Sequence, residues 1–227
     1  MSKTSCPPAP RTRCPQCQRA QRTCICALAQ PVEHGVQVLI LQHPMEVHEA
    51  KGTGRLLQLS LPHSRLLVGE QFDAAELQAA LHQPWAASVD IDTEPRQALL
   101  LYPETTEQDA ALQLLPAAPL PAHWPCPPRL LRLVVIDGTW RKSRKMLYLN
   151  PALQALPRLA LKDVPASGYA IRKAHLPGQL SSFEATVQAL AQLEDWTAQT
   201  PETERLAAVF SRFIAQQRAQ ADERARP

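Results

Sequence analysis

Four cysteines within thirteen residues form the most distinctive chemical pattern in this sequence. Cys14 and Cys17 are separated by two residues, and Cys24 and Cys26, further on, are separated by one. Four thiolates complete the tetrahedral shell of a structural zinc ion, and each close pair can direct both sulfurs toward one metal. We therefore expect a zinc knuckle over residues 14–34, with free or redox-active cysteines as the alternative interpretation.

A second candidate for chemistry is the tetrapeptide Asp137-Gly-Thr-Trp140, which directly follows the hydrophobic run of residues 130–136. A carboxylate at the end of a buried strand can accept a proton or bind an amine. Gly138 permits close approach of a ligand to the backbone, and Thr139 can cap the following helix. Trp140 can stack on a nucleobase or fill the core. The plainer alternative is a strand-to-helix turn in which Asp137 caps and Trp140 packs.

The elements that must position these residues follow from the alternation of apolar runs and amphipathic segments. Expected strands span residues 36–41, 65–68, 98–102 and 130–136, with shorter ones at 159–161 and 169–171. Expected helices span residues 53–61, 73–82, 139–148, 182–194 and 202–218. Buried strands separated by helices predict an α/β fold, with a mostly parallel sheet covered by helices on both faces. Residues 35–219 would form this domain, between a disordered tail (1–13) and a frayed end (220–227).

Ligands of such sheets bind beyond the carboxyl ends of the strands. Three polar clusters occupy such positions in the sequence, at residues 43–46, 102–104 and 137–140. We therefore expect the functional site at this edge of the sheet.

Composition restricts the class of protein. In 227 residues no stretch approaches the roughly 18 apolar residues of a membrane span, and residues 1–13 lack the apolar segment of a signal peptide. We expect a cytoplasmic protein without membrane contact, in which clustered cysteines favour a metal over disulfides. The net charge of +3 permits binding to nucleic acid but does not indicate it.

Several blocks together resemble one family. The segment Val134-Val-Ile-Asp-Gly-Thr-Trp-Arg-Lys-Ser-Arg-Lys-Met-Leu147 resembles the signature of the DTW-domain family, and the four-cysteine knuckle is similar to that of its bacterial members. The other similar blocks are His43-Pro-Met-Glu46 with Thr53-Gly-Arg-Leu-Leu57, then Leu101-Tyr-Pro103, and finally Tyr169-Ala-Ile-Arg-Lys173 with Leu180-Ser-Ser-Phe-Glu-Ala185. The last block departs from the commoner Ser-Thr-x-Glu form, although a serine keeps the hydroxyl group.

This resemblance implies a tRNA-uridine aminocarboxypropyltransferase with a SPOUT-like fold and a C-terminal trefoil knot. Such an enzyme transfers the 3-amino-3-carboxypropyl group of S-adenosylmethionine to N3 of a uridine in the tRNA variable loop and releases methylthioadenosine. Two alternatives remain open. They are a SPOUT-like RNA methyltransferase, which transfers another carbon of the same cofactor, and a non-enzymatic RNA-binding adaptor built on the zinc knuckle. The expected partner is tRNA, with no stable protein partner.

The resemblance and the strand-end positions together suggest a role for each candidate residue. Asp137 is expected to deprotonate uridine N3 or to bind the amine of the cofactor, with Thr139 and Trp140 beside it in the catalytic group. Candidate cofactor-binding residues are Tyr102, Pro103, Asp137, Gly138, Leu161, Tyr169, Arg172, Ser182 and Glu184. Candidate RNA-phosphate contacts are Arg55, Arg141, Lys142, Lys145 and Lys173.

Overall fold

The computed structural model describes residues 12–85, 95–104, 114–161 and 180–225. Five strands form one parallel sheet with the order β2-β1-β4-β3-β5. The strands are β1 (Gln37–Gln42), β2 (Ser64–Val68), β3 (Gln97–Leu101), β4 (Leu131–Asp137) and β5 (Arg158–Leu159). The longest of them, β4, lies at the centre, as its mainly apolar sequence predicts. The expectation of an α/β fold with a parallel sheet is confirmed.

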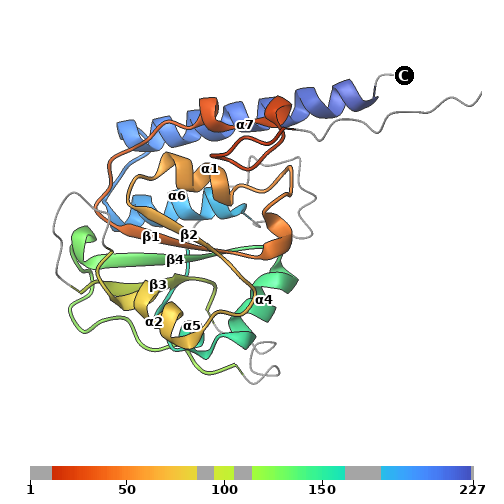
Figure 1. Ribbon diagram of the computed structural model, residues 1–227. Coiled ribbons are helices and arrows are strands. Elements are labelled where there is room, and N and C mark those ends of the chain that lie inside the picture. The colour runs from red at the N-terminus through yellow and green to blue at the C-terminus, as the bar shows by residue number, and fades with distance from the viewer. Residues whose placement is uncertain (1–11, 86–94, 105–113, 162–179, 226–227) are drawn as a thin grey trace, which may run out of the picture.

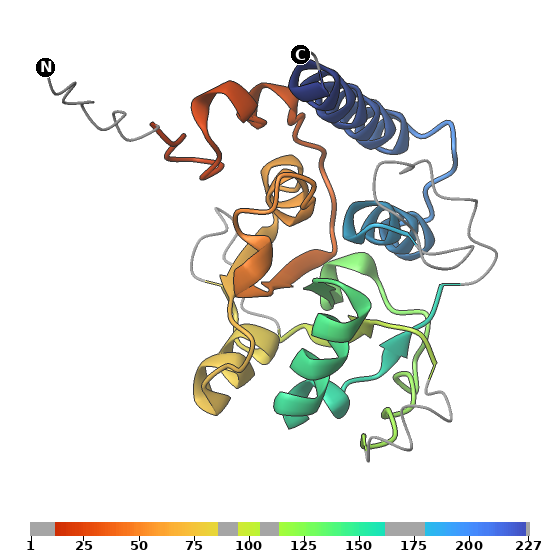
Figure 2. The same ribbon diagram turned by 90° about the vertical axis from the view of Figure 1, so that its right-hand side faces the viewer.

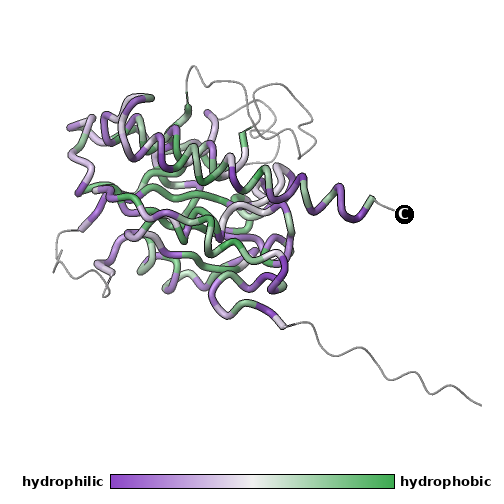
Figure 3. Tube along the Cα trace, turned by 90° about the horizontal axis from the view of Figure 1, so that it is seen from above, coloured by the Kyte–Doolittle hydropathy of each residue, from purple (hydrophilic) through white to green (hydrophobic). Residues whose placement is uncertain are grey.

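Helices cover both faces of the sheet (Figures 1 and 2). On one face lie α1 (Gly54–Ser60), α6 (Ser182–Leu193) and α7 (Pro201–Ala225), and on the other lie α2 (Ala74–His82), α4 (Trp140–Leu149) and α5 (Pro151–Gln154). Successive residues of β1 therefore enter two different cores. Val38 and Ile40 pack in the core that contains residues of α1, α6 and α7, whereas Leu39 and Leu41 pack in the core of α2, α4 and α5. Figure 3 shows the hydrophobic segments running through this central layer.

Helix starts follow their capping residues. Asp73 accepts hydrogen bonds from the amides of Ala75 and Glu76 at the start of α2, and Thr139 accepts from the amide of Lys142 at the start of α4. Ser181 caps α6 by a reciprocal arrangement with Glu184. These side chains satisfy amide donors that the first turn of a helix leaves without an intrahelical partner.

Two element ends differ from the expected ones. Helix α7 continues to Ala225, past the expected end at Arg218 and through part of the expected frayed tail, because residues after 218 are mostly good helix formers. The strand expected at 159–161 is the shorter β5. The strand expected at 169–171 lies outside the described residues. The expected C-terminal knot is not tested, because residues 162–179 also lie outside them.

The knuckle precedes the sheet and packs against the α7 side of it. Two short 3-10 helices, Gln21–Thr23 and Cys26–Leu28, follow the first cysteine pair, and Arg13 and Ala20 form an antiparallel bridge. Cys14, Cys17 and Ile25 are buried in the same core as α1 and α7. Within the described ranges, none of the helices has both the length and the apolar character needed to cross a bilayer.

His34, just before β1, is buried as a neutral side chain. Its Nδ1 lies 2.6 Å from the carbonyl oxygen of Val36, and its Nε2 lies 3.3 Å from the amide nitrogen of His63. An amide can only donate, so Nε2 must be the acceptor and Nδ1 must carry the proton. Burial is the main reason why the pKa of His34 falls from its ordinary value of 6.5 to about 4.

We therefore expect His34 to make folding stability depend on pH. Between pH 6.5 and pH 4 the unfolded chain binds a proton at this residue and the folded chain does not, so acid favours unfolding. The pKa difference corresponds to about 3 kcal/mol of unfolding free energy, present above pH 6.5 and lost as the pH falls to 4. Urea unfolding across this range should show a shallower pH dependence for His34→Gln than for the wild type. Equal dependences would contradict the assignment.

Candidate functional site

A cleft opens at the carboxyl ends of β3, β4 and β5, where the polar clusters of the sequence predict a site. Its volume is about 520 Å³, and a smaller cavity of about 110 Å³ shares six of its lining residues. A volume of this order suits a small-molecule ligand. Among the described residues, the walls of the larger cavity are Leu101, Tyr102, Pro103, Glu104, Trp140, Leu159, Ala160, Leu161, Leu180 and Ala185.

Aromatic rings form one wall of the cleft. Tyr102 is buried, whereas Trp140 is 43% exposed, and their rings meet edge to face with centroids 6.0 Å apart. The guanidinium of Arg158 lies over the Tyr102 ring at 5.2 Å and donates to the carbonyl of Pro103. Such a wall offers one fixed aromatic surface inside the cleft and one accessible ring at its edge.

The structure brings together most of the described candidates for cofactor binding. Tyr102, Pro103 and Leu161 line the larger cavity, and Gly138 and Ser182 line the smaller one. Tyr169, Arg172 and Lys173 lie outside the described residues.

Glu184 does not line this cleft. Its carboxylate accepts hydrogen bonds from the amide and hydroxyl groups of Ser181, and its side chain borders a different groove, between α6 and α7. Helical periodicity explains the difference, because Ser182 and Ala185 lie close together around the helix whereas Glu184 points to another side. The expected contact between Glu184 and a cofactor therefore has no support in this geometry.

Asp137 occupies the end of β4, as expected, but its carboxylate is only 1% exposed and does not line the cleft. Its Oδ2 accepts a hydrogen bond of 2.8 Å from Nε2 of Gln42, the last residue of β1. On the same side lies Gly54, the first residue of α1. A Cβ atom at Gly54 would collide with Asp137 Oδ2 and lie 3.0 Å from Gln42 Nε2. The carboxylate therefore fixes the junction of β1, β4 and α1.

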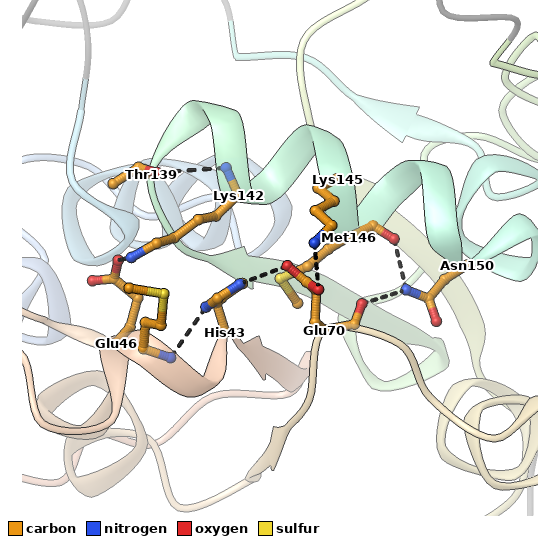
Figure 4. Close-up of polar contacts among 9 residues, drawn as sticks. His43, Glu46, Glu70, Thr139, Lys142, Lys145, Met146 and Asn150 are labelled. Carbon is orange, nitrogen blue, oxygen red and sulfur yellow. Dashed lines mark hydrogen bonds and ion pairs between the residues drawn. The ribbon is translucent and has the colours of Figure 1, made fainter.

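A polar network joins this edge of the sheet to α4 (Figure 4). Lys142 Nζ lies 2.8 Å from Oε1 of Glu46, whose side chain is only 2% exposed. Glu70 bridges His43 Nε2 at 2.9 Å and Lys145 Nζ at 2.8 Å. Hydrogen bonds from Lys145, and then from His43, lower the pKa of the Glu70 carboxyl group. The positive charges on both lysines are thus matched by carboxylates of the protein itself.

The residues expected to contact phosphate therefore differ in how readily their side chains could bind one. Lys142 and Lys145 brace α4, so binding a phosphate would compete with their internal ion pairs. Arg141 is exposed, and Arg55 is half-buried and donates to Oε1 of Gln58 at 2.5 Å. Arg141 and Lys145 are the exposed candidates among the described ones, and Lys145 is already paired with Glu70.

The four cysteines converge as the spacing predicts. All four Sγ atoms lie within 4.8 Å of one another, with Cys14 and Cys26 at 3.6 Å and Cys17 and Cys24 at 3.7 Å. A tetrahedral zinc site with Zn–S bonds of about 2.3 Å places its sulfurs about 3.8 Å apart. Hydrogen bonds from the amides of Cys17 and Gln16 lower the pKa of the Cys14 thiol to about 6, whereas burial and then the neighbouring thiols raise the pKa of Cys26, so Cys14 is the thiol that ionises first. The cluster can hold a metal ion.

Sequence reasoning missed four residues that shape the site. Glu70 follows β2, so the strand-end argument could have found it. Gly54 lies in the block Thr53-Gly-Arg-Leu-Leu57 and Gln42 directly precedes the block His43-Pro-Met-Glu46, but neither residue carries a chemical signal of its own. Arg158 belongs to β5, a strand of only two residues, which no periodicity could indicate.

Fold and site together define an α/β protein with a ligand cleft at the carboxyl edge of its sheet. The DTW domain family matches residues 11–218, and the chain belongs to this family. A relative from Drosophila melanogaster named tRNA-uridine aminocarboxypropyltransferase 2 is 34% identical over 196 residues, which cover 83% of this chain and 69% of the relative. Proteins of the same name from Mus musculus and Macaca fascicularis are 27% and 26% identical over 190 residues. The matches span 81% of this chain and 57% of each of these two relatives. No solved structure gave a significant match.

The contact between Gly54 and Asp137 predicts a strong effect of a single methyl group. Gly54→Ala should lower the free energy of unfolding by about 1–3 kcal/mol, because the buried carboxylate and α1 must move apart. Asp137→Ala removes the colliding group, so the double variant should lose less stability than the two single variants together. Urea unfolding of all four proteins measures this coupling. Strictly additive losses would show that the two residues do not constrain each other.

The thiol geometry predicts one bound metal ion per chain. Cys17→Ser should lose most of this metal and lower the melting temperature, because Cys17 is also buried in the core. Cys126→Ser is the matched control, since Cys126 lies outside the cluster. Elemental analysis of the purified proteins provides the measurement. Full metal content in Cys17→Ser would contradict the site.

Proposed function

We propose that this protein is a tRNA-uridine aminocarboxypropyltransferase that modifies N3 of a uridine in the variable loop. Membership of the DTW domain family, with relatives that carry this name, supports the reaction class. The single structural observation that carries the proposal is the cleft of about 520 Å³ bordered by residues of the Asp137-Gly-Thr-Trp140 motif.

The cleft suits an adenosyl group by its chemistry as well as its size. Its walls are mainly apolar, with Leu101, Leu159 and Leu161 beside Tyr102, and strand ends supply backbone groups for hydrogen bonds. S-adenosylmethionine, when bound there, would supply a sulfonium. Uridine N3 would lose its proton to solvent and attack the γ-carbon of the methionine tail, while the carbon–sulfur bond breaks and its electron pair stays on the sulfur of methylthioadenosine.

Three carbons are bonded to that sulfonium. Which of them reacts depends on how the protein positions the donor relative to the nucleobase. Gly138 lines the smaller cavity, which lies beside the end of β4. Trp140, exposed at the edge of the cleft, is placed to stack on the target base. Ser143 and Ser182 offer hydroxyl groups to the smaller cavity. Together they would bring the nucleobase to the tail of the donor and not to its methyl group.

The role of Asp137 in this proposal is to hold the site in shape. Its carboxylate is directed to Gln42 and α1, and accepting the N3 proton would require it to turn toward the cleft. We propose that Asp137 fixes the end of β4, so that Gly138 and Trp140 face the ligand. The earlier alternatives, general base and ligand of the cofactor amine, remain predictions that this geometry does not favour.

The finer assignments belong to the same proposal. We propose a SPOUT-like arrangement, supported by the parallel sheet and a cleft at its carboxyl ends. We propose zinc as the metal, because four thiolates in tetrahedral spacing suit it best. We propose a cytoplasmic location, which a tRNA substrate supports.

Incubation of the purified protein with tRNA and S-adenosylmethionine tests the function. Mass spectrometry of the nucleosides should show a uridine with the added aminocarboxypropyl group, and methylthioadenosine should appear as the by-product. Adenosylhomocysteine with a methylated nucleoside would make the protein a methyltransferase. Calorimetry that detects no binding of S-adenosylmethionine would favour an RNA-binding adaptor.

The proposed stacking role of Trp140 predicts that loss of its ring lowers activity on tRNA. Trp140→Ala should lower kcat/KM for tRNA by about tenfold or more, because stacking on a base contributes about 1–3 kcal/mol. Tyr148→Ala is the matched control, since Tyr148 is an exposed aromatic residue on the same helix that does not line the cleft. Steady-state kinetics with varied tRNA provides the comparison. Equal effects of the two variants would remove Trp140 from substrate recognition.

A further inference from the structure

Arg19 connects the knuckle to the segment that leads into α1. It lies in the chain between the two cysteine pairs, and its backbone carbonyl accepts a hydrogen bond from the amide of Cys14. Its buried guanidinium donates to the carbonyl of Ala50 at 2.7 Å and to the carbonyl of Gly52 at 2.6 Å. The same residue therefore belongs to the cysteine loop through its backbone and holds residues 50–52 through its side chain.

The segment that Arg19 holds has little freedom of its own. Gly52 is packed so tightly that an added Cβ would lie 3.2 Å from the carbonyl oxygens of both Glu46 and Glu49. Thr53 is completely buried, and Gly54 lies directly against the carboxylate of Asp137. The position of the Gly52 carbonyl thus determines, two residues later, where α1 meets the end of β4.

Helix α7 supports Arg19 from the other side. The guanidinium lies 5.3 Å from the centre of the Phe213 ring, and Gln216 Nε2 donates to the carbonyl of Cys24 at 3.0 Å. Figures 1 and 2 show the knuckle, in red, beside α7 on the face of the sheet that carries α1. The cysteine loop is therefore held by α7 while its arginine holds the segment before α1.

We propose that Arg19 is a positioning residue through which metal binding in the knuckle sets the geometry of residues 50–54 and, through Gly54, of Asp137 and the cleft. A four-cysteine loop of this size depends on its metal for a fixed conformation. Without the metal the backbone of Arg19 is no longer fixed, and the two hydrogen bonds to residues 50–52 lose their anchor. The part of this proposal that concerns catalysis rests on the proposed function, and the structural part does not.

Hydrogen exchange on the full-length, metal-loaded protein tests the structural part. The amides of Gly52 and Leu57 are informative, because they donate to the carbonyls of Glu49 and Thr53. Arg19→Gln should keep one metal ion per chain but speed exchange at these amides by about tenfold or more, since it removes charge-assisted hydrogen bonds. Arg22→Gln, an exposed arginine of the same knuckle, is the matched control and should leave exchange unchanged.

Metal removal distinguishes transmission through Arg19 from general loosening. Chelation should speed amide exchange at Gly52 and Leu57 in the wild type. In Arg19→Gln it should change the exchange rate little further, because the hydrogen bonds from residue 19 to residues 50 and 52 are already lost. An equal effect of chelation in both proteins would overturn the proposal, and so would unchanged exchange in metal-loaded Arg19→Gln. Arg19→Lys keeps the positive charge but has one donor nitrogen in place of the two that bind Ala50 and Gly52. It should give an intermediate exchange rate, and it serves as the second variant if Arg19→Gln does not fold.

Kinetics then separate positioning from binding. Arg19→Gln should lower kcat and leave KM for tRNA nearly unchanged, with partial recovery in Arg19→Lys. If the protein has no transferase activity, the proposed function fails, whereas the exchange experiment still decides whether metal binding is transmitted through Arg19.

Discussion

The buried carboxylate of Asp137 is the contact on which the rest of the site depends. Gln42 and Asp137 stand opposite each other in the register of β1 and β4, and Gly54 brings α1 against the same oxygen. Removing a carboxylate from water is costly unless hydrogen bonds replace the lost solvation. This requirement fixes two central strands and one helix relative to each other, and the next residue of the chain, Gly138, borders the smaller cavity.

Ion pairs at the same edge hold α4 in a similar way. Glu46 is almost completely buried and therefore needs the ammonium group of Lys142, and Glu70 joins β2 to α4 through Lys145. Trp140, at the start of α4, is carried by this arrangement to the edge of the cleft. Residues that read in the sequence as a basic patch thus orient the helix that presents the aromatic ring.

The sequence allowed prediction of those features that depend on local pattern. The apolar runs located the four longer strands to within one or two residues, and the strand-end rule placed Tyr102, Gly138 and Trp140 beside one cleft. Strand order and register are set by long-range packing, so the pairing of Gln42 with Asp137 had no local signal. Strand alternation then directs Asp137 to the face of Val135 and of α1, away from the neighbouring Ile136. The partner of Lys142 was unpredictable for the same reason, whereas Ser181 and Glu184 form a Ser-x-x-Glu capping box, which is a local signal in the sequence.

The internal pairing of Lys142 and Lys145 has a consequence for how the proposed RNA substrate would be recognised. Ammonium groups that already neutralise protein carboxylates are less able to neutralise phosphates, so RNA docking there would release few of the cations condensed on its backbone. The entropic contribution that usually dominates polynucleotide affinity is correspondingly small at this edge. Discrimination between RNA molecules would then depend more on the fit of a folded loop against the protein surface than on the density of its backbone charge.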